Sequence, residues 1–485
     1  MNKVLPAFML LYELTRPAFS QNRTYEKSQQ IALAATTTVG RHTITGIIQT
    51  AGQADKDWSA YYRIFEQCRI SMSQCWDTVL QQAISLTPED MPFVVAMDDT
   101  ITSRKGTKGH GVALRRDPQG PKYRPNFIHG QRWVQLSALV PFNGYQSRAT
   151  AVPINMLHAP TPKKPGPKAT DEQRSEYKAK QKACRVTKVG ADAMKELRER
   201  MDKNPDTKHR RLVLTVDGGY MNKTMLTDIP ENTTIIGRLR RDAKLTKLPD
   251  KQLVTGRRRK YGEPIPKPDL IRQDESYEWE YICVYASGKF HVVRIKTVDR
   301  VRWRGVGTQD FRLIVVAPTP YRLRKNGRTL YRNPAYILCS DPDMPVEQVV
   351  QSYIWRWEQE VAFREEKSYF GIGDPQVWCE NSVCNVIPFL VWVYSLMHLA
   401  AIISGVKDEE LPRPKWQRQT IDGRLSTNRL AMFMRQEVID APHEREYGDV
   451  VARLQASIHP MSKSKTRSRQ NSEIHQYPAW LYAMK

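Results

Sequence analysis

Two apolar runs of five residues each end in an aspartate. Phe93–Met97 runs into Asp98 and Asp99, and Leu212–Val216 runs into Asp217. Runs of this length and character predict buried strands that deliver a carboxylate to the edge of a sheet. An aspartate at a strand end is also a common turn cap, so each run alone is weak evidence for a site.

A third acidic residue lies in a segment with an unusual combination of side chains. Tyr353, Arg356, Glu360 and Lys367 stand at offsets of 0, 3, 7 and 14, and no helix breaker follows Pro345. At about 100° per residue, these four positions of one helix fall within an arc of roughly 60°. A solvated charged face, with Arg356 simply paired to Glu360, is the structural alternative. That alternative explains the charges, but it does not explain the tyrosine and tryptophans that accompany them.

Three converging carboxylates would repel one another, and a divalent cation makes their proximity tolerable. Mg²⁺ prefers hard oxygen ligands, and a pair of such ions can align a nucleophile with the leaving oxygen of a phosphodiester. Arginine binds a phosphate as a bidentate fork, and lysine binds it as a compact charge. The residue types therefore indicate phosphoryl-transfer chemistry on a polyanion.

The charge of the chain agrees with a polyanionic partner. The 485 residues include 75 Lys and Arg against 51 Asp and Glu, a net charge of +24. A field of this sign favours nucleic acid or an anionic membrane surface. The seven cysteines form no CxxC pair, so we expect free thiols in a reducing cytosol rather than a disulfide or zinc framework.

Two apolar segments bear on the choice between nucleic acid and membrane. The run 4–12 is interrupted by Glu13 and Arg16, which favours a docking helix over a signal peptide. The run 386–405 contains Pro388, and a buried core helix explains it without a bilayer. We therefore expect a cytoplasmic protein with no membrane partner.

The pattern of elements predicts an α/β chain in which a catalytic core is interrupted by a β-rich insertion, with helical regions at both ends. The connection between Asp217 and Glu360 is too long for a simple loop, and its alternating runs predict strands. The predicted regions are 1–90 (helical, DNA-binding), 91–235 (first core segment, with a basic linker at 158–203), 236–340 (β-rich insertion), 341–405 (second core segment) and 406–485 (helical and basic).

Additional basic or polar residues are candidate DNA contacts. The stretch 41–48, with Arg41 and Thr43, allows the recognition helix of a helix-turn-helix, although plain helical packing is the alternative. Lys105 follows the first aspartate motif and is expected either to approach DNA or to be solvated. The basic tail 462–469 is expected to be mobile, in contact with phosphate or with nothing.

The motif Tyr-x2-Arg-x3-Glu-x6-Lys, from Tyr353 to Lys367, resembles the signature of bacterial insertion-sequence transposases of the DDE class. The Asp-Asp-Thr of residues 98–100 looks like the first motif of that cut-and-paste family. The strand ending at Asp217 looks like the second motif. The run from Leu338 to Asp341 is similar to a strand end that these enzymes place before the glutamate helix. The resemblance covers about residues 90–400.

This resemblance implies a ribonuclease-H-like core in which Asp98, Asp217 and Glu360 are catalytic and hold two Mg²⁺ ions, for which Mn²⁺ substitutes. It implies that Tyr353, Arg356 and Lys367 contact phosphates near the transposon end, and that a tryptophan of the insertion, here Trp303, stacks on a flipped base. The implied partners are double-stranded DNA, as terminal inverted repeats and as target, and a second copy of the chain in a synaptic complex.

Some alternatives stay open at the level of sequence. The family's Asp-x-Thr pattern selects Asp98, but Asp99 also precedes a threonine and is the alternative first ligand. A ribonuclease-H-fold nuclease or resolvase that cuts without joining would use the same residues. A domesticated, non-catalytic DNA-binding protein is the remaining alternative, although such a protein has no need of three carboxylates.

Overall fold

The computed structural model describes residues 3–117, 120–121, 123–249, 259–322, 327–416, 423–441, 450–452 and 454–455. The chain divides into two compact units. The first comprises Met1–Leu80, Thr102–Gly130 and Arg364–Lys485, and the second comprises Gln81–Ile101 and Gln131–Phe363. The basic tail 462–469, which was expected to be mobile and in contact with phosphate or with nothing, lies outside the described residues.

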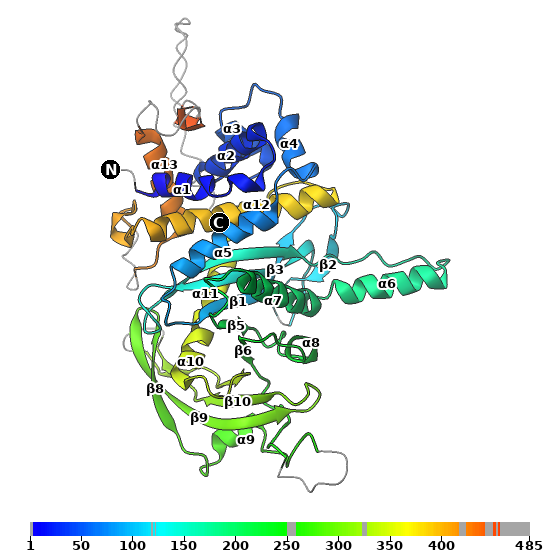
Figure 1. Ribbon diagram of the computed structural model, residues 1–485, viewed down its shortest axis with the longest axis vertical. Helices are drawn as coiled ribbons and strands as arrows, with labels where there is room; N and C mark the ends of the chain where they lie inside the picture. Colours follow the sequence, from blue (N-terminus) through cyan, green and yellow to red (C-terminus); the bar gives the residue numbers. More distant parts are fainter. Residues whose placement is uncertain are drawn as a thin grey trace, which may run out of the picture. The chain divides into compact units, whose positions relative to one another are not determined.

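The first unit consists mainly of helices arranged around α12 (Figure 1). Helices α1, α2 and α4 pack on α12, and the rings of Tyr12 and Trp392 lie 5.4 Å apart. The carboxylate of Glu437 accepts a hydrogen bond from Leu5 N at 2.7 Å, which satisfies a free amide at the start of α1. The elements are α1 (Val4–Glu13), a 3₁₀ turn (Arg16–Ala18), α2 (Asn22–Thr37), α3 (Ile44–Thr50), α4 (Ser59–Glu66), β2 (Ala113–Arg116), α12 (Glu380–Ile403), a second 3₁₀ turn (Asp408–Glu410) and α13 (Thr427–Asp440).

Among the described residues, α12 is the helix that is long and apolar enough to cross a membrane. Of its apolar 18-residue window, 89% is buried within the protein. Pro388 lies inside the helix, near its first turns. This burial confirms the prediction of a core helix for the apolar run 386–405.

The N-terminal region is helical, as predicted, and the segment 41–48 contributes α3 to it. Ile44, Ile47 and Ile48 of this seven-residue helix are buried. The hydroxyl of Thr43 accepts a hydrogen bond from Gly46 N at 3.0 Å, so Thr43 is the N-cap of α3. Packing accounts for the short helix, and its function as a recognition helix stays a prediction.

The second unit is built on a large mixed sheet. The strand order of this sheet is β2-β3-β1-β5-β6-β13-β10-β9-β7, in which β2 is the strand already given with the first unit; β4 pairs with β3, and β8 pairs with β9. Two strands of this unit begin or end in the first unit, as do helices α5 and α11. The elements are α5 (Met72–Ser85), β1 (Phe93–Ser103), β3 (Phe127–Pro141), β4 (Ala149–His158), α6 (Asp171–Ala183), α7 (Val186–Lys203), β5 (Leu212–Val216), α8 (Lys223–Leu226), β6 (Thr233–Arg238), β7 (Leu245–Thr246), α9 (Pro268–Gln273), β8 (Glu280–Ala286), β9 (Lys289–Trp303), β10 (Asp310–Val316), β11 (Pro320–Tyr321), β12 (Leu330–Tyr331), β13 (Ala335–Cys339), α10 (Val346–Trp355) and α11 (Trp357–Ser368).

The β-rich region that was predicted as an insertion continues the central sheet. Strand β13 pairs antiparallel with β6, and β10, β9 and β7 follow it in order. The predicted boundary at residue 236 falls inside β6, whose outer edge needs a partner for its backbone hydrogen bonds. The division of the chain into five regions stays a prediction.

Helix α10 packs on one face of the central strands. A buried cluster joins Val349 and Val350 of this helix to Val94 and Ala96 of β1 and to Val213 of β5. Because side chains alternate between the two faces of a strand, this cluster identifies the face that α10 covers. The same alternation determines which acidic residues project on that face.

The segment around Glu360 differs from the single helix that was predicted. Helix α10 ends at Trp355 and α11 begins at Trp357. Arg356, between them, keeps helical backbone angles (φ −51°, ψ −28°), so the interruption is slight. The interruption therefore affects only the junction of the two helices, which is where Arg356 lies.

Candidate active site: carboxylates at the ends of two parallel strands

Strand register places Asp98 and Asp217 next to each other. Strands β1 and β5 are parallel, and their last paired positions are Met97 and Val216. The next residue on each strand is an aspartate, so both carboxyl groups lie at the same edge of the sheet. Their proximity has an electrostatic effect, because the charge of Asp217 contributes to raising the pKa of Asp98.

Both aspartates also project on the face that α10 covers. Val94, Ala96 and Asp98 alternate along β1, and Val213 and Asp217 share a face of β5 in the same way. Val94, Ala96 and Val213 belong to the same buried cluster as Val349 and Val350 of α10. The helices that follow from α10 into α11 are therefore in position to bring a further side chain to these carboxylates.

Arg356 joins Asp98 to Glu360. Its Nη1 donates to Asp98 Oδ2 at 3.1 Å, and its Nη2 donates to Glu360 Oε1 at 2.9 Å. The guanidinium is largely buried, with its side chain 12% exposed. The ion pair with Glu360 that the sequence spacing allowed is thus present, and a second ion pair reaches the strand. One guanidinium holds the first and third predicted carboxylates together.

The carboxylates outnumber the cation that contacts them. Burial raises the pKa of Asp98 to about 7, and Asp99 and Asp217 add to this effect while Arg356 opposes it. Asp98 and Glu360 share the Arg356 guanidinium, so this pair of carboxylates carries one surplus negative charge when both are ionised, and Asp217 lies beside them. Carboxylate oxygens are the ligands that hard divalent cations prefer, and a divalent cation would balance this surplus. The chemistry of these donor groups therefore fits a divalent metal ion.

Asp99 is engaged in a different set of contacts. Its Oδ2 accepts from Arg132 Nε at 2.7 Å, and its Oδ1 accepts from the Tyr220 hydroxyl at 3.3 Å. Alternation along β1 directs Asp99 to the face opposite Asp98. Both oxygens of Asp99 are thus occupied by protein donors, and Asp98 is the residue that shares a face with Asp217.

Arg132 and Tyr220 are supporting residues that the sequence did not reveal. They stand on β3 and in the turn after β5, and only the fold brings them to Asp99. Gly190 of α7 permits the approach, because a Cβ at this position would lie 2.9 Å from Tyr220 Cε1 and 3.0 Å from Met97 Cε. The backbone of α7 therefore sits directly against the residues around Asp99.

Tyr353 is half-buried at the same site. Its ring lies beneath the Arg356 guanidinium, whose Cζ is 5.7 Å from the ring centroid. Burial raises the pKa of its phenol, and the charge of Asp217 acts in the same direction. Tyr353 is therefore protonated at neutral pH and can donate a hydrogen bond. Lys367 belongs to the portion of α11 that lies in the first unit.

The remaining predicted DNA contacts lie elsewhere. Trp303 ends β9 and pairs with Leu245. Following the registers from β9 through β10, β13 and β6 to β5 puts Trp303 at the sheet edge opposite Asp217. Arg41 and Lys105 line a pocket in the first unit. For these residues, contact with DNA stays a prediction.

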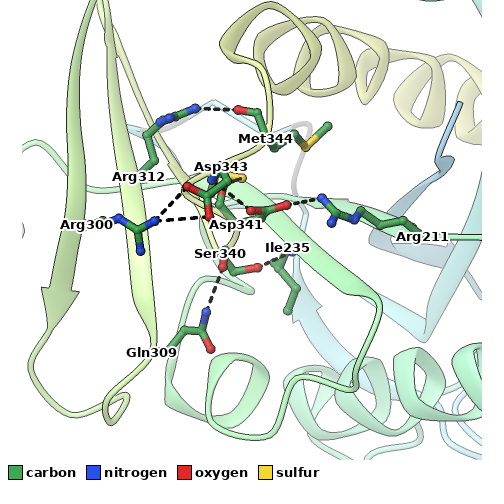
Figure 2. Close-up of polar contacts among 10 residues, drawn as sticks. Arg211, Ile235, Arg300, Gln309, Arg312, Ser340, Asp341, Asp343 and Met344 are labelled. Atoms are coloured by element: carbon green, nitrogen blue, oxygen red, sulfur yellow. Dashed lines mark hydrogen bonds and ion pairs between the residues drawn. The ribbon is translucent and has the colours of Figure 1, made fainter.

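Asp341, at the end of β13, is also at that opposite edge. Figure 2 shows its carboxylate between the β13–α10 loop and Arg211, with which it forms an ion pair. Its Oδ1 accepts from Asp343 N at 3.0 Å, and Asp343 pairs with Arg300 at 2.9 Å. Because β13 runs antiparallel to β6, its end meets the beginnings of β6 and β5. The Asp341 motif thus fixes the entry into α10 and does not join Asp98 and Asp217.

Comparison with known protein families relates the chain to a family of nucleases. Residues 15–310 match a family model described as DDE superfamily endonuclease. Asp98 and Asp217 lie within the matched residues, and Glu360 lies beyond them. No curated protein matches the chain.

Proposed function

Because the chain belongs to the DDE superfamily of endonucleases, we propose that it is a transposase that cleaves DNA at transposon ends and joins those ends to target DNA. Endonucleases of this superfamily generally use divalent metals and act on DNA. The observation that supports the finer assignment is the arrangement of Asp98, Asp217 and Glu360. Two come from adjacent parallel strands on one face, and Arg356 connects the third to the first.

We further propose that the core is ribonuclease-H-like. In support, β1 lies in the middle of the sheet, with parallel β5 and β6 on one side and the β3–β4 hairpin on the other. The central strand and its parallel neighbour supply the two aspartates. A helix that packs on the same face supplies the glutamate, so one layer of packing positions all three groups.

In the proposed reaction, Asp98, Asp217 and Glu360 hold two Mg²⁺ ions, and Mn²⁺ substitutes for them. Held by these residues, such ions would lower the pKa of the attacking water and would stabilise charge on the phosphorus centre and the leaving oxygen. Arg356 positions Asp98 and Glu360, and the supporting contacts of Asp99 fix β1 just beyond its pairing with β5. The phenol of Tyr353 and the ammonium of Lys367 bind the DNA phosphates near the end of the element.

The chemistry proceeds in two phosphoryl transfers. Water attacks a phosphodiester at the element end, the P–O bond to the 3′-oxygen breaks, and that oxygen takes up a proton to become a free 3′-hydroxyl. The hydroxyl then loses its proton as it attacks a phosphodiester of target DNA, and the target strand's 3′-oxygen leaves. No oxidant or energy cofactor is needed, since each step exchanges one phosphodiester P–O bond for another P–O bond.

The net charge of +24 supports DNA as the partner, because each neutralised phosphate releases condensed counterions. We propose that a homodimer holds two transposon ends in a synaptic complex, in the bacterial cytoplasm. Size measurement by light scattering, with and without end DNA, tests this assembly. A complex that contains one chain per DNA end and never two chains together would contradict it.

The function is tested by incubating the protein with genomic DNA that spans its own element, a target plasmid and Mg²⁺. Wild type is expected to nick the element ends and join them to the plasmid, whereas Glu360→Gln binds DNA but neither nicks nor joins. Glu347→Gln is the matched control, because Glu347 is an exposed glutamate of the neighbouring helix α10. Nicking without joining would favour a nuclease or resolvase. Binding without Mg²⁺-dependent nicking would favour a non-catalytic DNA-binding protein.

A further inference from the structure

A pocket in the first unit is separate from the carboxylate site. Its volume is about 670 Å³, within the range of small-molecule and nucleotide sites. It lies between the loop 104–112, which joins β1 to β2, the loop 371–379, which precedes α12, and the segment before α3. We call it the hairpin pocket, because the β2–β3 hairpin contributes Ile128 and His129 to its lining.

The walls of the hairpin pocket carry an excess of positive charge. Arg41, Arg104, Lys105 and Lys108 line it, and Asp374 is the one acidic residue among the lining residues. The two lysines are exposed, in a loop with glycines at positions 106 and 109. The pocket is therefore suited to an anion, and its two lysines are accessible to one.

Hydrogen bonds hold the two main loops together. Nη1 of Arg104 donates to the carbonyl oxygens of Gly373, at 3.0 Å, and Pro375. The backbone N–H of His110 donates to the carbonyl oxygen of Trp378 at 2.9 Å. The loop that carries the lysines is thus fixed to the loop that carries Trp378.

The single carboxylate of the pocket is already engaged. Oδ2 of Asp374 accepts from His42 N at 2.8 Å, and Oδ1 lies 3.9 Å from Arg41 Nε. Gly371 makes this packing possible, because a Cβ there would lie 2.6 Å from Asp374 Oδ2. Asp374 therefore serves the structure of the pocket and offsets some of the charge of Arg41, leaving the lysines as the cations for a ligand.

Trp378 adds a planar apolar surface to these charges. It lines the pocket with 68% of its surface exposed, and Val112 and Ile128 supply further apolar lining. A large exposed indole beside accessible ammonium groups combines the two features that bind single-stranded nucleic acid, a stacking platform and phosphate contacts. An acidic peptide would engage the lysines but would offer no planar partner for the indole.

We propose that the hairpin pocket binds an unpaired nucleotide of the DNA substrate, with its base stacked on Trp378 and its phosphates against Lys105 and Lys108. The nucleotide is unpaired because neighbouring base pairs cover the faces of a base within a duplex. This inference rests on the proposed action on DNA and assigns to the first unit a site for one feature of that substrate.

The test measures binding of two duplexes of the same sequence, one fully paired and one with a one-nucleotide bulge, by fluorescence anisotropy in EDTA. Wild type binds the bulged duplex about 5- to 100-fold more tightly, the range expected for one stacked base. Trp378→Ala loses this preference and keeps its affinity for the paired duplex. Trp416→Ala is the matched control, since Trp416 is 67% exposed and lies outside the pocket.

Two further variants separate the pocket from general effects. Lys105→Ala/Lys108→Ala weakens binding of the bulged duplex more than the charge-matched Lys163→Ala/Lys164→Ala of the basic linker. Gly373→Leu is expected to remove the preference while leaving the fold intact, because a Cβ at Gly373 meets no atom within 4 Å. Unchanged thermal unfolding midpoints would establish that each variant is folded.

The inference is overturned if wild type binds both duplexes equally, or if Trp378→Ala keeps the bulge preference. Either result, together with Mg²⁺-dependent nicking by the same preparation, would leave the proposed function intact. A wild-type protein that binds neither duplex would overturn both the inference and the proposed function.

Discussion

The strands of the central sheet in the second unit have two opposite ends, and we call each row of strand ends an edge of the sheet. Both edges carry aspartates and arginines, but in different proportions. Where the pairing of β1 with β5 ends, Asp98 and Glu360 share one guanidinium, that of Arg356, and Asp217 lies beside Asp98. This edge has more carboxylates than cations, and burial raises the pKa of Asp98 to about 7.

At the opposite edge the charges are balanced. Asp341 pairs with Arg211 and Asp343 pairs with Arg300, while the backbone N–H of Asp343 donates to Asp341 Oδ1 (Figure 2). Each carboxylate has a protein cation of its own, so this edge has no need of another ion. An aspartate near the end of a strand thus stabilises a loop where it has an arginine partner of its own, and it is a candidate metal ligand where the carboxylates outnumber their cations.

The largest contrast between the two edges is expected in catalysis. Asp98→Asn should lower the rate of DNA nicking by more than about 100-fold, because residues that only orient metal ligands typically account for 10–100-fold. Asp341→Asn should retain nicking and lower the free energy of unfolding by about 1 kcal/mol or less, the usual range for a solvent-accessible ion pair. Single-turnover nicking rates and urea unfolding measure the two effects. Similar nicking rates for the two variants would remove the distinction between the edges.

A smaller effect is expected from the neighbouring aspartate. Asp99→Asn should reduce nicking by about 10–100-fold, because it weakens the contacts to Arg132 and Tyr220 that hold β1 beside Asp98. The rate should recover partially at high Mg²⁺ concentration, since the variant keeps the proposed ligands. A loss as complete as that of Asp98→Asn, with no response to Mg²⁺, would identify Asp99 as a ligand instead.

The first unit contains a third arrangement of buried polar side chains, a hydrogen-bonded network of Glu365, Thr427 and His398. The buried Glu365 accepts from the Thr427 hydroxyl at 2.6 Å, so Thr427 in turn accepts from Nε2–H of the neutral His398 at 2.9 Å. Burial lowers the pKa of His398 to about 4, below its ordinary value of 6.5. The network is a matched chain of donors and acceptors rather than an excess of carboxylates.

This network should respond to pH and not to divalent ions. Between pH 6.5 and 4 the unfolded chain binds a proton at His398 that the folded chain does not, so acid favours unfolding. As the pH is lowered through this window, the free energy of unfolding of the wild type should decrease more steeply than that of His398→Gln. The difference in slope should be up to about 1.4 kcal/mol per pH unit. Urea unfolding at several pH values, with EDTA or Mg²⁺, measures this difference. Parallel stability curves for the two proteins would contradict the low pKa.

A further effect, on stability alone, concerns the residues that pack against Asp99 and the end of the β1–β5 pairing. Gly190→Ala should lower the free energy of unfolding by about 1–3 kcal/mol, because its Cβ would press on Tyr220 and Met97. Gly219→Ala is the control, since a Cβ there meets no atom within 4 Å. Thermal unfolding compares them, and equal midpoints would show that α7 has room to move.

Local patterns were sufficient for the strands that carry the aspartates. The apolar run 212–216 coincides with β5, and the run 93–97 is the first half of β1. The extension of β1 to Ser103 was missed, because its second half alternates polar and apolar residues and depends on long-range pairing. The slight break at Arg356 was also missed, since no proline or glycine marks it.

Which of Asp98 and Asp99 shares a face with Asp217 could be determined only from the tertiary structure. All five residues from Phe93 to Met97 are buried, so alternation in the sequence does not reveal which face meets the glutamate helix. The contact of Asp99 with Arg132 spans 33 residues. Trp378 of the hairpin pocket was missed for the same reason. It is far from the β1–β2 loop in the sequence, and hydrogen bonds from Arg104 hold the loop of Trp378 against that loop in the fold.

The most direct test of the central claim is divalent-ion binding itself, measured as the loss of free Mn²⁺ signal in electron paramagnetic resonance. Wild type is expected to bind two Mn²⁺ ions per chain in the presence of DNA, as is Asp341→Asn. Asp217→Asn should bind fewer ions, or bind them more weakly by at least tenfold. Equal numbers and affinities in wild type and Asp217→Asn would show that the charge-rich edge is not where the metal binds.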